Sequence, residues 1–221
     1  MISPLRLVLL GPPASGKGTL AELIHQKWMI PITSTGSIIR KEIEQKTAYG
    51  EQVAHAIAEG KLAPDPLVMT LVTRWLDALQ QESFLFDGFP RTIPQAELLD
   101  ALLKEREQSL KAVIWLELDR STIEERTLAR RVCRACRRAV SLGLHVQSEE
   151  ESCPSCGGEL FQRADDSIEV LNRRMSIYEE HTLPLKSYYQ AQGILEIIDA
   201  SRPREEVMSE ISDLLEQERV S

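Results

Sequence analysis

Three groups of residues in this 221-residue chain have types and spacings that suit a chemical task. The first is a glycine-rich segment that ends in a lysine and a threonine, Gly11-Pro12-Pro13-Ala14-Ser15-Gly16-Lys17-Gly18-Thr19. Glycines let the backbone curl so that its N–H groups face a phosphate, and the lysine adds a mobile positive charge. A hydroxyl residue most often follows that lysine directly, whereas here Gly18 intervenes and Thr19 supplies the hydroxyl. Because an apolar run precedes the segment and a helical pattern follows it, we interpret it as a phosphate-binding loop rather than a plain turn.

The second group is a set of cysteines in two C-x2-C pairs, Cys133, Cys136, Cys153 and Cys156. This spacing is typical of a zinc site with four thiolate ligands. Four protein ligands leave no open position, so the ion would be structural, and its binding would fold a segment too small to fold alone. Reduced thiols without a metal, or a redox-active pair, are the alternatives to this interpretation. The spacing also leaves iron open as the metal in place of zinc.

A carboxylate and a guanidinium share a short turn after the apolar residues 84–86. The turn reads Asp87-Gly88-Phe89-Pro90-Arg91-Thr92. An acidic residue at a strand end organises Mg²⁺ in many enzymes with this type of phosphate-binding loop. Turns favour Asp for reasons of their own, so the functional interpretation depends on the neighbouring Arg91.

The elements that would position these residues alternate between strands and helices. Short apolar runs predict five strands, at residues 5–10, 30–34, 83–86, 112–118 and 194–198. Helical periodicity predicts helices at residues 16–28, 38–43, 51–58, 65–80, 95–106, 121–130, 167–193 and 203–217. We expect Ser121 to cap the helix it begins, residues 47–50 to form a turn, and residues 132–163 to be irregular. The alternation predicts an α/β fold with a parallel sheet covered on both faces.

Bulk composition narrows the class of protein. The chain is 43% hydrophobic, which suffices for one substantial core. Its net charge is −8, and an acidic chain is a poor general binder of nucleic acid. No apolar run is long enough for a signal peptide or a membrane span. We therefore expect a cytoplasmic protein without membrane association, whose cysteines stay reduced.

In the order and spacing of its motifs the chain resembles the adenylate kinases. The matching motifs are residues 11–19, Ser34-Thr35-Gly36, residues 87–92 and Arg163-Ala164-Asp165-Asp166, within a similarity that runs from about residue 5 to 203. The resemblance implies a P-loop NTPase-type α/β fold with a five-stranded parallel sheet flanked by helices. It implies a core domain at residues 1–33, 64–128 and 167–221, a monophosphate-binding domain at 34–63 and a zinc-binding lid at 129–166. It also implies ATP, AMP and ADP as ligands, Mg²⁺ bound with the nucleotide, and a monomer.

The resemblance further implies a role for each matching position. The ATP site would comprise residues 11–19, with Lys17 on the donor phosphates, and Arg126, Arg130 and Arg202. The AMP site would comprise Thr35, Gly36, Arg40, Lys61, Leu62, Ala63, Gly88, Arg91, Gln95, Arg163 and Arg174. Catalysis would rest on Lys17, Asp87, Arg91, Arg130, Arg163 and Arg174. Phosphoryl transfer needs mainly positioning and charge stabilisation, for which bidentate guanidinium groups are well suited.

Several positions separate this chain from neighbouring families or from the usual family pattern. Related kinases of pyrimidine monophosphates usually carry Ala where Thr35 stands, so Thr35 and Gln95 favour AMP as the acceptor. The family usually has Asp where this chain has Ser37. In the lid, Val140 and Ser141 replace the family's usual Tyr-His pair, and Leu144 replaces a usual Phe. We therefore expect the lid to pack differently and to hold the base of the donor nucleotide less firmly.

Two other functions are alternatives to the adenylate kinase interpretation. One is a P-loop ATPase that holds nucleic acid on a zinc ribbon, suggested by the basic residues Arg126, Arg130, Arg131, Arg134, Arg137 and Arg138. Against it, Glu149-Glu150-Glu151 lies in the same segment, and no aromatic residues interleave with the arginines for base stacking. The other is a catalytically weakened relative that only binds nucleotide.

Overall fold

The computed structural model of the chain describes residues 3–58, 61–148, 150–163 and 166–220. Three residues named in the sequence analysis lie outside these ranges, namely Glu149, Ala164 and Asp165. Within the described residues, no helix is both long and apolar enough to cross a membrane.

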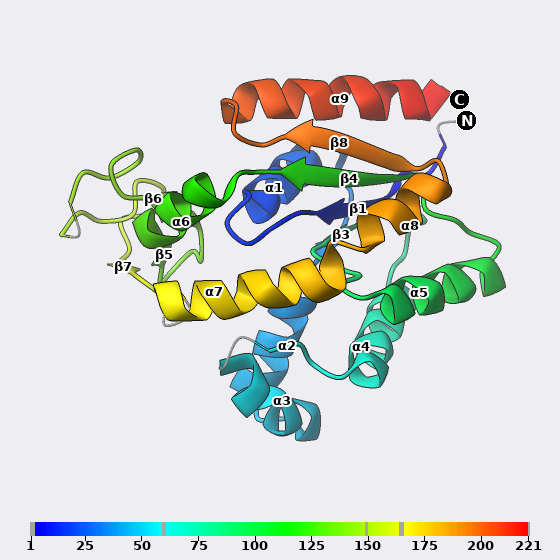
Figure 1. The fold of residues 1–221 in the computed structure, drawn as a ribbon, viewed down its shortest axis with the longest axis horizontal. Helices are drawn as coiled ribbons and strands as arrows, with labels where there is room; N and C mark the ends of the chain where they lie inside the picture. The colour runs from blue at the N-terminus through cyan, green and yellow to red at the C-terminus, as the bar shows by residue number, and fades with distance from the viewer. Residues whose placement is uncertain (1–2, 59–60, 149, 164–165, 221) are drawn as a thin grey trace.

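A five-stranded parallel sheet forms the centre of the molecule (Figure 1). Its strands are β1 (Arg6–Leu10), β2 (Ile32–Thr33), β3 (Phe84–Asp87), β4 (Ala112–Glu117) and β8 (Leu195–Asp199), in the spatial order β2-β3-β1-β4-β8. All four strand pairings are parallel. The predicted α/β fold with a five-stranded parallel sheet is therefore confirmed. Strand β1 lies in the middle of the sheet, and β4 is also an interior strand, between β1 and β8.

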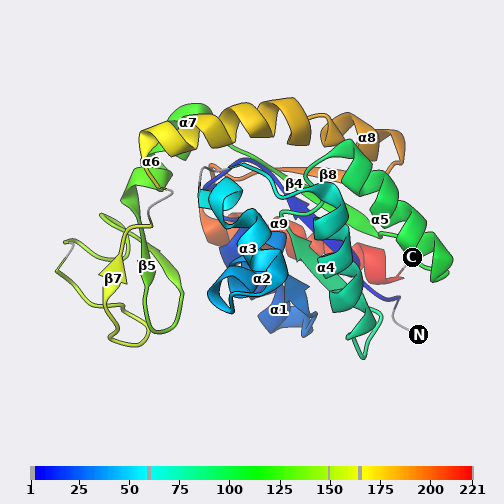
Figure 2. The same cartoon turned by 90° about the horizontal axis from the view of Figure 1, so that it is seen from below.

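Helices cover both faces of the sheet, because the strand residues that point to each face are apolar. In β1, Leu7 and Leu9 pack with α1 (Lys17–Trp28) and α9 (Arg204–Val220), whereas Val8 and Leu10 face the opposite core. That second core also contains residues of α4 (Asp65–Asp77), α5 (Ile93–Glu105) and α8 (Leu185–Ala191). Figures 1 and 2 show the two helical layers on opposite sides of the sheet. This burial on both faces is what near-continuous apolar strands require.

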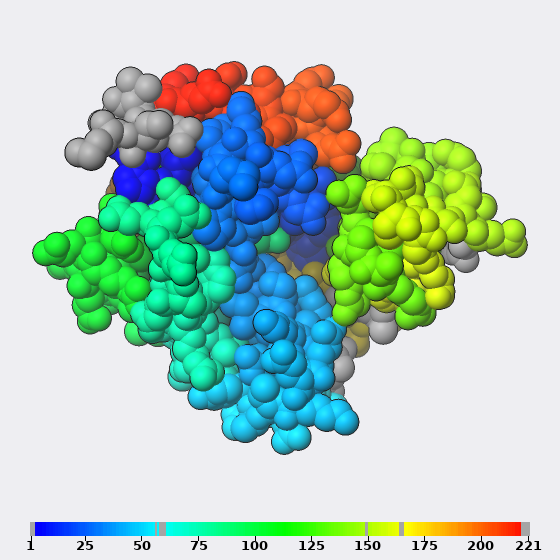
Figure 3. All heavy atoms as spheres, turned by 180° about the vertical axis from the view of Figure 1, so that it is seen from behind, coloured from blue at the N-terminus to red at the C-terminus, as the bar shows by residue number. Residues whose placement is uncertain are grey.

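Two excursions from the sheet lie near each other at one side of the molecule. The first consists of α2 (Thr35–Glu44) and α3 (Ala48–Ala58). The second follows α6 (Arg120–Ala129) and is a small antiparallel sheet of β5 (Arg130–Cys133), β6 (Ala139–Ser141) and β7 (Leu160–Phe161). Figure 3 shows this yellow-green sheet region standing apart beside the light-blue helices, with a hollow between them. Arg137 bridges the two excursions through a 2.7 Å contact with Glu44.

Several local expectations are corrected by the structure. Asp119, not Ser121, caps α6, because its carboxylate accepts a hydrogen bond from the backbone N–H of Thr122. Residues 48–50 belong to α3 rather than to a turn, and residues 132–163 contain β6, β7 and the end of β5. The long helix predicted for 167–193 is divided into α7 (Ile168–Ile177), a π-helical turn at Tyr178–Thr182 and α8.

Candidate nucleotide site and metal centre

The glycine-rich segment connects the carboxyl end of β1 to the first turn of α1, as its pattern predicts. Gly11 is required by close packing, since a Cβ at this position would lie 2.6 Å from the backbone oxygen of Leu116. Gly16 serves as the N-cap of α1 with a φ of 89°, a left-handed conformation that favours glycine. Because the N-cap offers no side chain, the first backbone N–H groups of the helix are left for a ligand, and anions bind well there.

Lys17 is the first residue of α1 and bends back over the loop. Its Nζ donates hydrogen bonds to the backbone oxygens of Gly11 at 2.9 Å and Pro12 at 2.6 Å. Burial lowers the pKa of Lys17 to about 7. Asp87 opposes this shift, while the neighbouring arginines 91, 174 and 130 reinforce it. The lysine therefore lies within a cluster of positive charge that would become favourable once an anion is bound.

A cavity next to Lys17 brings together residues of two sequence motifs, the phosphate loop and the turn after β3, with residues of α7. It is lined by residues of the phosphate loop, by Gly88 and Arg91 after β3, and by Arg174 of α7. Arg91 is fixed through its side chain and its backbone, because Nε donates to the Gly88 oxygen at 2.9 Å and Thr182 donates to the Arg91 oxygen at 2.9 Å. Burial and the nearby Arg174 lower the pKa of Arg91 to about 10. Such a concentration of cations suits a ligand with several negative charges.

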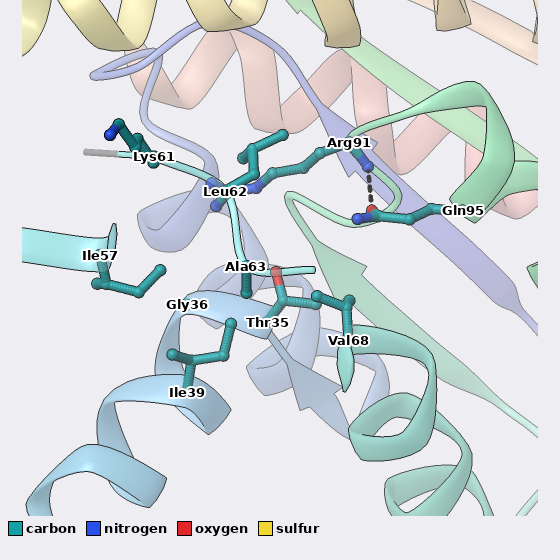
Figure 4. A pocket seen from close by; sticks show the side chains of 10 residues that line it. All are labelled: Thr35, Gly36, Ile39, Ile57, Lys61, Leu62, Ala63, Val68, Arg91 and Gln95. Carbon is teal, nitrogen blue, oxygen red and sulfur yellow. Dashed lines mark hydrogen bonds between the residues drawn. The ribbon is translucent and has the colours of Figure 1, made fainter. Parts of the chain in front are cut away.

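A second cavity opens between the helical excursion, the start of α4 and the turn that follows β3 (Figure 4). Of the described residues, ten line this cavity. Seven of them were predicted for the AMP site, namely Thr35, Gly36, Lys61, Leu62, Ala63, Arg91 and Gln95. The other members are Ile39, Ile57 and Val68. Apolar walls with a few polar groups are typical of a pocket for a small organic ligand. Arg91 lines both cavities and so connects them.

Gln95 presents the main polar side chain at the far wall of this second cavity. It is only 2% exposed, and its Oε1 accepts a 2.8 Å hydrogen bond from the backbone N–H of Arg91 (Figure 4). Thr35 is also buried, at 6% exposure, near Val68 in Figure 4. Arg40 extends along α2, where a Cβ on Gly36 would lie 3.2 Å from its guanidinium.

Ser37, which stands where the family usually has Asp, has a local structural task. Ser34 and Ser37 form a capping box at the start of α2, in which Ser34 Oγ accepts from the Ser37 N–H at 3.0 Å. Ser37 Oγ accepts in return from the Ser34 N–H at 3.3 Å. The hydroxyl therefore meets the capping requirement of this helix.

The remaining predicted arginines lie at three further places. Arg126 donates to the Ala200 oxygen at 3.0 Å, and Arg202 donates to the neighbouring Asp199 oxygen at 3.3 Å, so these two meet at the end of β8. Arg130 begins β5 and is held by Asp166. Arg163 follows β7, and among the described residues it lines neither cavity.

The four cysteine Sγ atoms converge within 4.8 Å of one another at the tip of the small sheet. The Cys133–Cys156 and Cys136–Cys153 sulfur separations are 3.4 Å and 3.7 Å. Sulfurs at about 2.3 Å around a tetrahedral Zn²⁺ would be separated by roughly 3.8 Å, so the arrangement fits such an ion. A Cβ on Gly158 would lie 2.8 Å from Cys133 Sγ, so the space beside the thiols is closed to larger residues.

Comparison with known proteins agrees with this geometry. A sequence model of the family described as adenylate kinase matches residues 9–194. The chain belongs to the adenylate kinase family. It is 40% identical over 214 residues to the adenylate kinase of Carboxydothermus hydrogenoformans, covering 96% of this chain and 100% of the relative. Similar matches are the adenylate kinases of Geobacter sulfurreducens, 39% identical with 96% and 98% covered, and Moorella thermoacetica, 43% identical with 90% and 92% covered.

Residues that are distant in the sequence meet at these cavities, as expected for an adenylate kinase. Some of the side-chain contacts there were not predicted from the sequence. Asp65 receives hydrogen bonds from Gln95 and Thr92, and Asp166 holds Arg130. A turn-starting Asp before Pro66 is too common a signal to have identified Asp65 from sequence. Two of the positions that depart from the usual family pattern differ in their surroundings, since Val140 is 4% exposed and Leu144 is 74% exposed.

Proposed function

We propose that this adenylate kinase family member transfers the terminal phosphoryl group of Mg·ATP to AMP, reversibly, giving two ADP. The observation that carries the proposal is the position of Arg91, which lines both the phosphate cavity beside Lys17 and the cavity with Thr35 and Gln95. A donor phosphate on one side and an acceptor phosphate on the other would therefore meet at one guanidinium. In-line transfer needs this kind of shared alignment.

We assign the donor to the phosphate loop and the acceptor to the second cavity. Lys17 would hold the donor phosphates, with Arg126 and Arg202 at the donor base. Arg40 and Arg91 would bind the acceptor phosphate, and Thr35 with Gln95 would recognise its base. Arg130, Arg163 and Arg174 would stabilise the transferring group.

The chemistry requires little acid–base work from the protein. Charge accumulates on the equatorial oxygens during transfer, and fixed guanidinium groups stabilise it without reorganising. Mg²⁺, organised by Asp87 when bound with the nucleotide, would neutralise part of the phosphate charge. Movement of residues 129–166 and 34–63 toward the core would exclude water, so that AMP rather than water accepts the phosphoryl group.

We propose Zn²⁺ as the metal of the four-cysteine centre, in a structural role. The tetrahedral fit of the sulfur separations and the absence of an open ligand position among four thiolates support this assignment. Two basic residues of this small sheet have acidic partners in the chain, since Arg134 contacts Glu159 at 3.1 Å and Arg137 contacts Glu44 at 2.7 Å. This pairing argues against the alternative of a nucleic-acid-binding ribbon.

The direct test measures ADP formation from Mg·ATP with AMP, UMP, CMP and GMP separately, beside a reaction without acceptor. We expect rapid turnover with AMP only, and loss of turnover in Lys17→Met. Lys27→Met is the matched control. Lys27 lies on the same helix, and its ion pair with Glu216, at 3.1 Å, is exposed at the surface. Hydrolysis of ATP without an acceptor, or no reaction with any of the four, would contradict the proposal.

A further inference from the structure

Behind Gln95 lies a carboxylate that does not itself line the acceptor cavity in the described part of the chain. Asp65, the first residue of α4, accepts a 2.6 Å hydrogen bond on Oδ1 from Gln95 Nε2. Its other oxygen, Oδ2, accepts a 3.2 Å hydrogen bond from Thr92 Oγ1. Thr92 in turn accepts from the backbone N–H of Gln95 at 3.2 Å, so its hydroxyl proton is free to point at Asp65.

These contacts determine which way the Gln95 carboxamide faces. Asp65 offers only acceptor atoms in this arrangement, and the backbone N–H of Arg91 is only a donor. The amide nitrogen must therefore face Asp65, while the amide oxygen faces Arg91 at 2.8 Å. Rotating the carboxamide by half a turn would oppose two acceptors at one end and two donors at the other. Both partners thus favour the same orientation.

A carboxamide fixed at one end distinguishes between the edges of purine bases. After its two internal contacts, Gln95 retains one N–H and one lone pair of its oxygen for a ligand. A 6-aminopurine offers an acceptor at N1 and a donor at the 6-position, whereas a 6-oxopurine offers the reverse. A freely rotating carboxamide would satisfy either base, but a fixed one satisfies only one of them.

We infer that Asp65 is a positioning residue which fixes Gln95 for a 6-aminopurine acceptor and against a 6-oxopurine. The inference rests on the proposed function, because it concerns the base of the acceptor nucleotide. It assigns Asp65 no contact with the substrate. Its effect is selectivity, since leaving a buried polar group mismatched is unfavourable at such sites.

The first experiment measures kcat and KM with AMP and with IMP in the wild type, Asp65→Ala and Asp65→Asn. We expect the AMP-to-IMP ratio of kcat/KM to fall by about tenfold in Asp65→Ala. A smaller fall is expected in Asp65→Asn, because its amide oxygen still accepts from Gln95. The KM for ATP should stay within about twofold of the wild type in both variants, since the donor site is not involved.

Asp77→Asn is the matched control. Asp77 ends the same helix, pairs with Arg106 at 2.5 Å, and its side chain is 60% exposed. This variant should keep the wild-type ratio. An unchanged ratio in active Asp65→Ala would overturn the inference alone, whereas a wild type without AMP-dependent ADP formation would overturn the proposed function as well.

A second experiment tests the contact without relying on activity. Gln95→Glu would place a carboxylate against Asp65 and should lower the melting temperature (Tm). Adding Asp65→Asn should recover most of the lost Tm, because an amide N–H of Asn then faces the new carboxylate. A further loss of Tm in the double variant would show that the two side chains do not interact in this way and would overturn the inference.

Discussion

The fully buried carboxylate of Asp166 holds the guanidinium of Arg130 through two hydrogen bonds, of which Nε to Oδ2 measures 3.0 Å. A bidentate pair of this kind fixes both the position and the plane of the arginine. Arg130 is near enough to Lys17 to lower its pKa. Asp166 therefore sets where this positive charge lies relative to the phosphate loop.

Asp166→Asn should impair both folding and turnover. Removing the charge from one partner of a buried pair costs about 3 kcal/mol, which corresponds to a Tm loss of roughly 6–12 °C in a chain of this size. We also expect kcat to fall by about tenfold, since Arg130 would be less well aligned. Thermal melts and steady-state kinetics measure the two effects. Glu44→Gln, which removes the exposed pair with Arg137, should change the Tm by little, and an equal loss in both variants would contradict the special role of Asp166.

Arg91→Ala should reduce turnover without unfolding the protein. The backbone hydrogen bonds of Arg91 to Gln95 and Thr182 remain in the variant, and repulsion from Arg174 is relieved. We expect kcat to fall by about 100-fold or more, with a higher KM for AMP and a nearly unchanged KM for ATP. Circular dichroism and steady-state kinetics check this. Arg106→Ala is the control, because Arg106 lies at the far end of α5, and it should retain activity. Near-wild-type turnover of Arg91→Ala would contradict the assignment of Arg91 to the acceptor phosphate.

The features predicted best from the sequence depend on local pattern. The phosphate loop is recognisable because its glycines, lysine and following helix all lie within residues 11–28. The central strands are recognisable because burial on both faces makes them nearly all apolar. The two cysteine pairs carry the same kind of local signal, and the structure brings their sulfurs together.

The features that were missed depend on contacts between distant residues or on very short elements. Strands β6 and β7 have three and two residues, too few for an alternating pattern to be distinguished from a loop. The Asp65–Gln95 and Arg130–Asp166 contacts join residues 30 and 36 positions apart, and nothing local signals such pairing. Asp119 and Ser121 are both good capping residues, so only the geometry decides that Asp119 caps α6.

Gly158→Ala should remove the metal from the four-cysteine centre. The added Cβ would lie 2.8 Å from Cys133 Sγ and 2.9 Å from the Ala135 Cβ, which forces the thiols apart. We expect elemental analysis to find about one Zn per wild-type chain and much less in the variant, with a lower Tm. Gly157→Ala is the control, because its φ of 71° strains the backbone while no atom lies within 4 Å of the new Cβ. Wild-type protein without any metal would contradict the zinc assignment. Iron in place of zinc would show that the centre holds a different metal.

Lys17 should make ATP binding depend on pH above neutrality. Burial lowers the pKa of Lys17 to about 7, and bound phosphates would raise it again, so binding is coupled to uptake of a proton. Affinity should therefore be highest below about pH 7 and fall with rising pH, by up to about tenfold per pH unit, until the pKa of the complex is reached. Lys17→Arg keeps its charge throughout this range and should show no such decline.

Calorimetry near pH 8 measures this linkage directly. In buffers with different ionisation enthalpies, the wild type should take up a fraction of a proton on binding ATP, whereas Lys17→Arg should take up almost none. The nucleotide phosphates are already deprotonated at this pH, so they contribute little to the exchange. Equal proton uptake in the two proteins would show that Lys17 is charged before the nucleotide arrives, and that its burial does not govern the binding equilibrium.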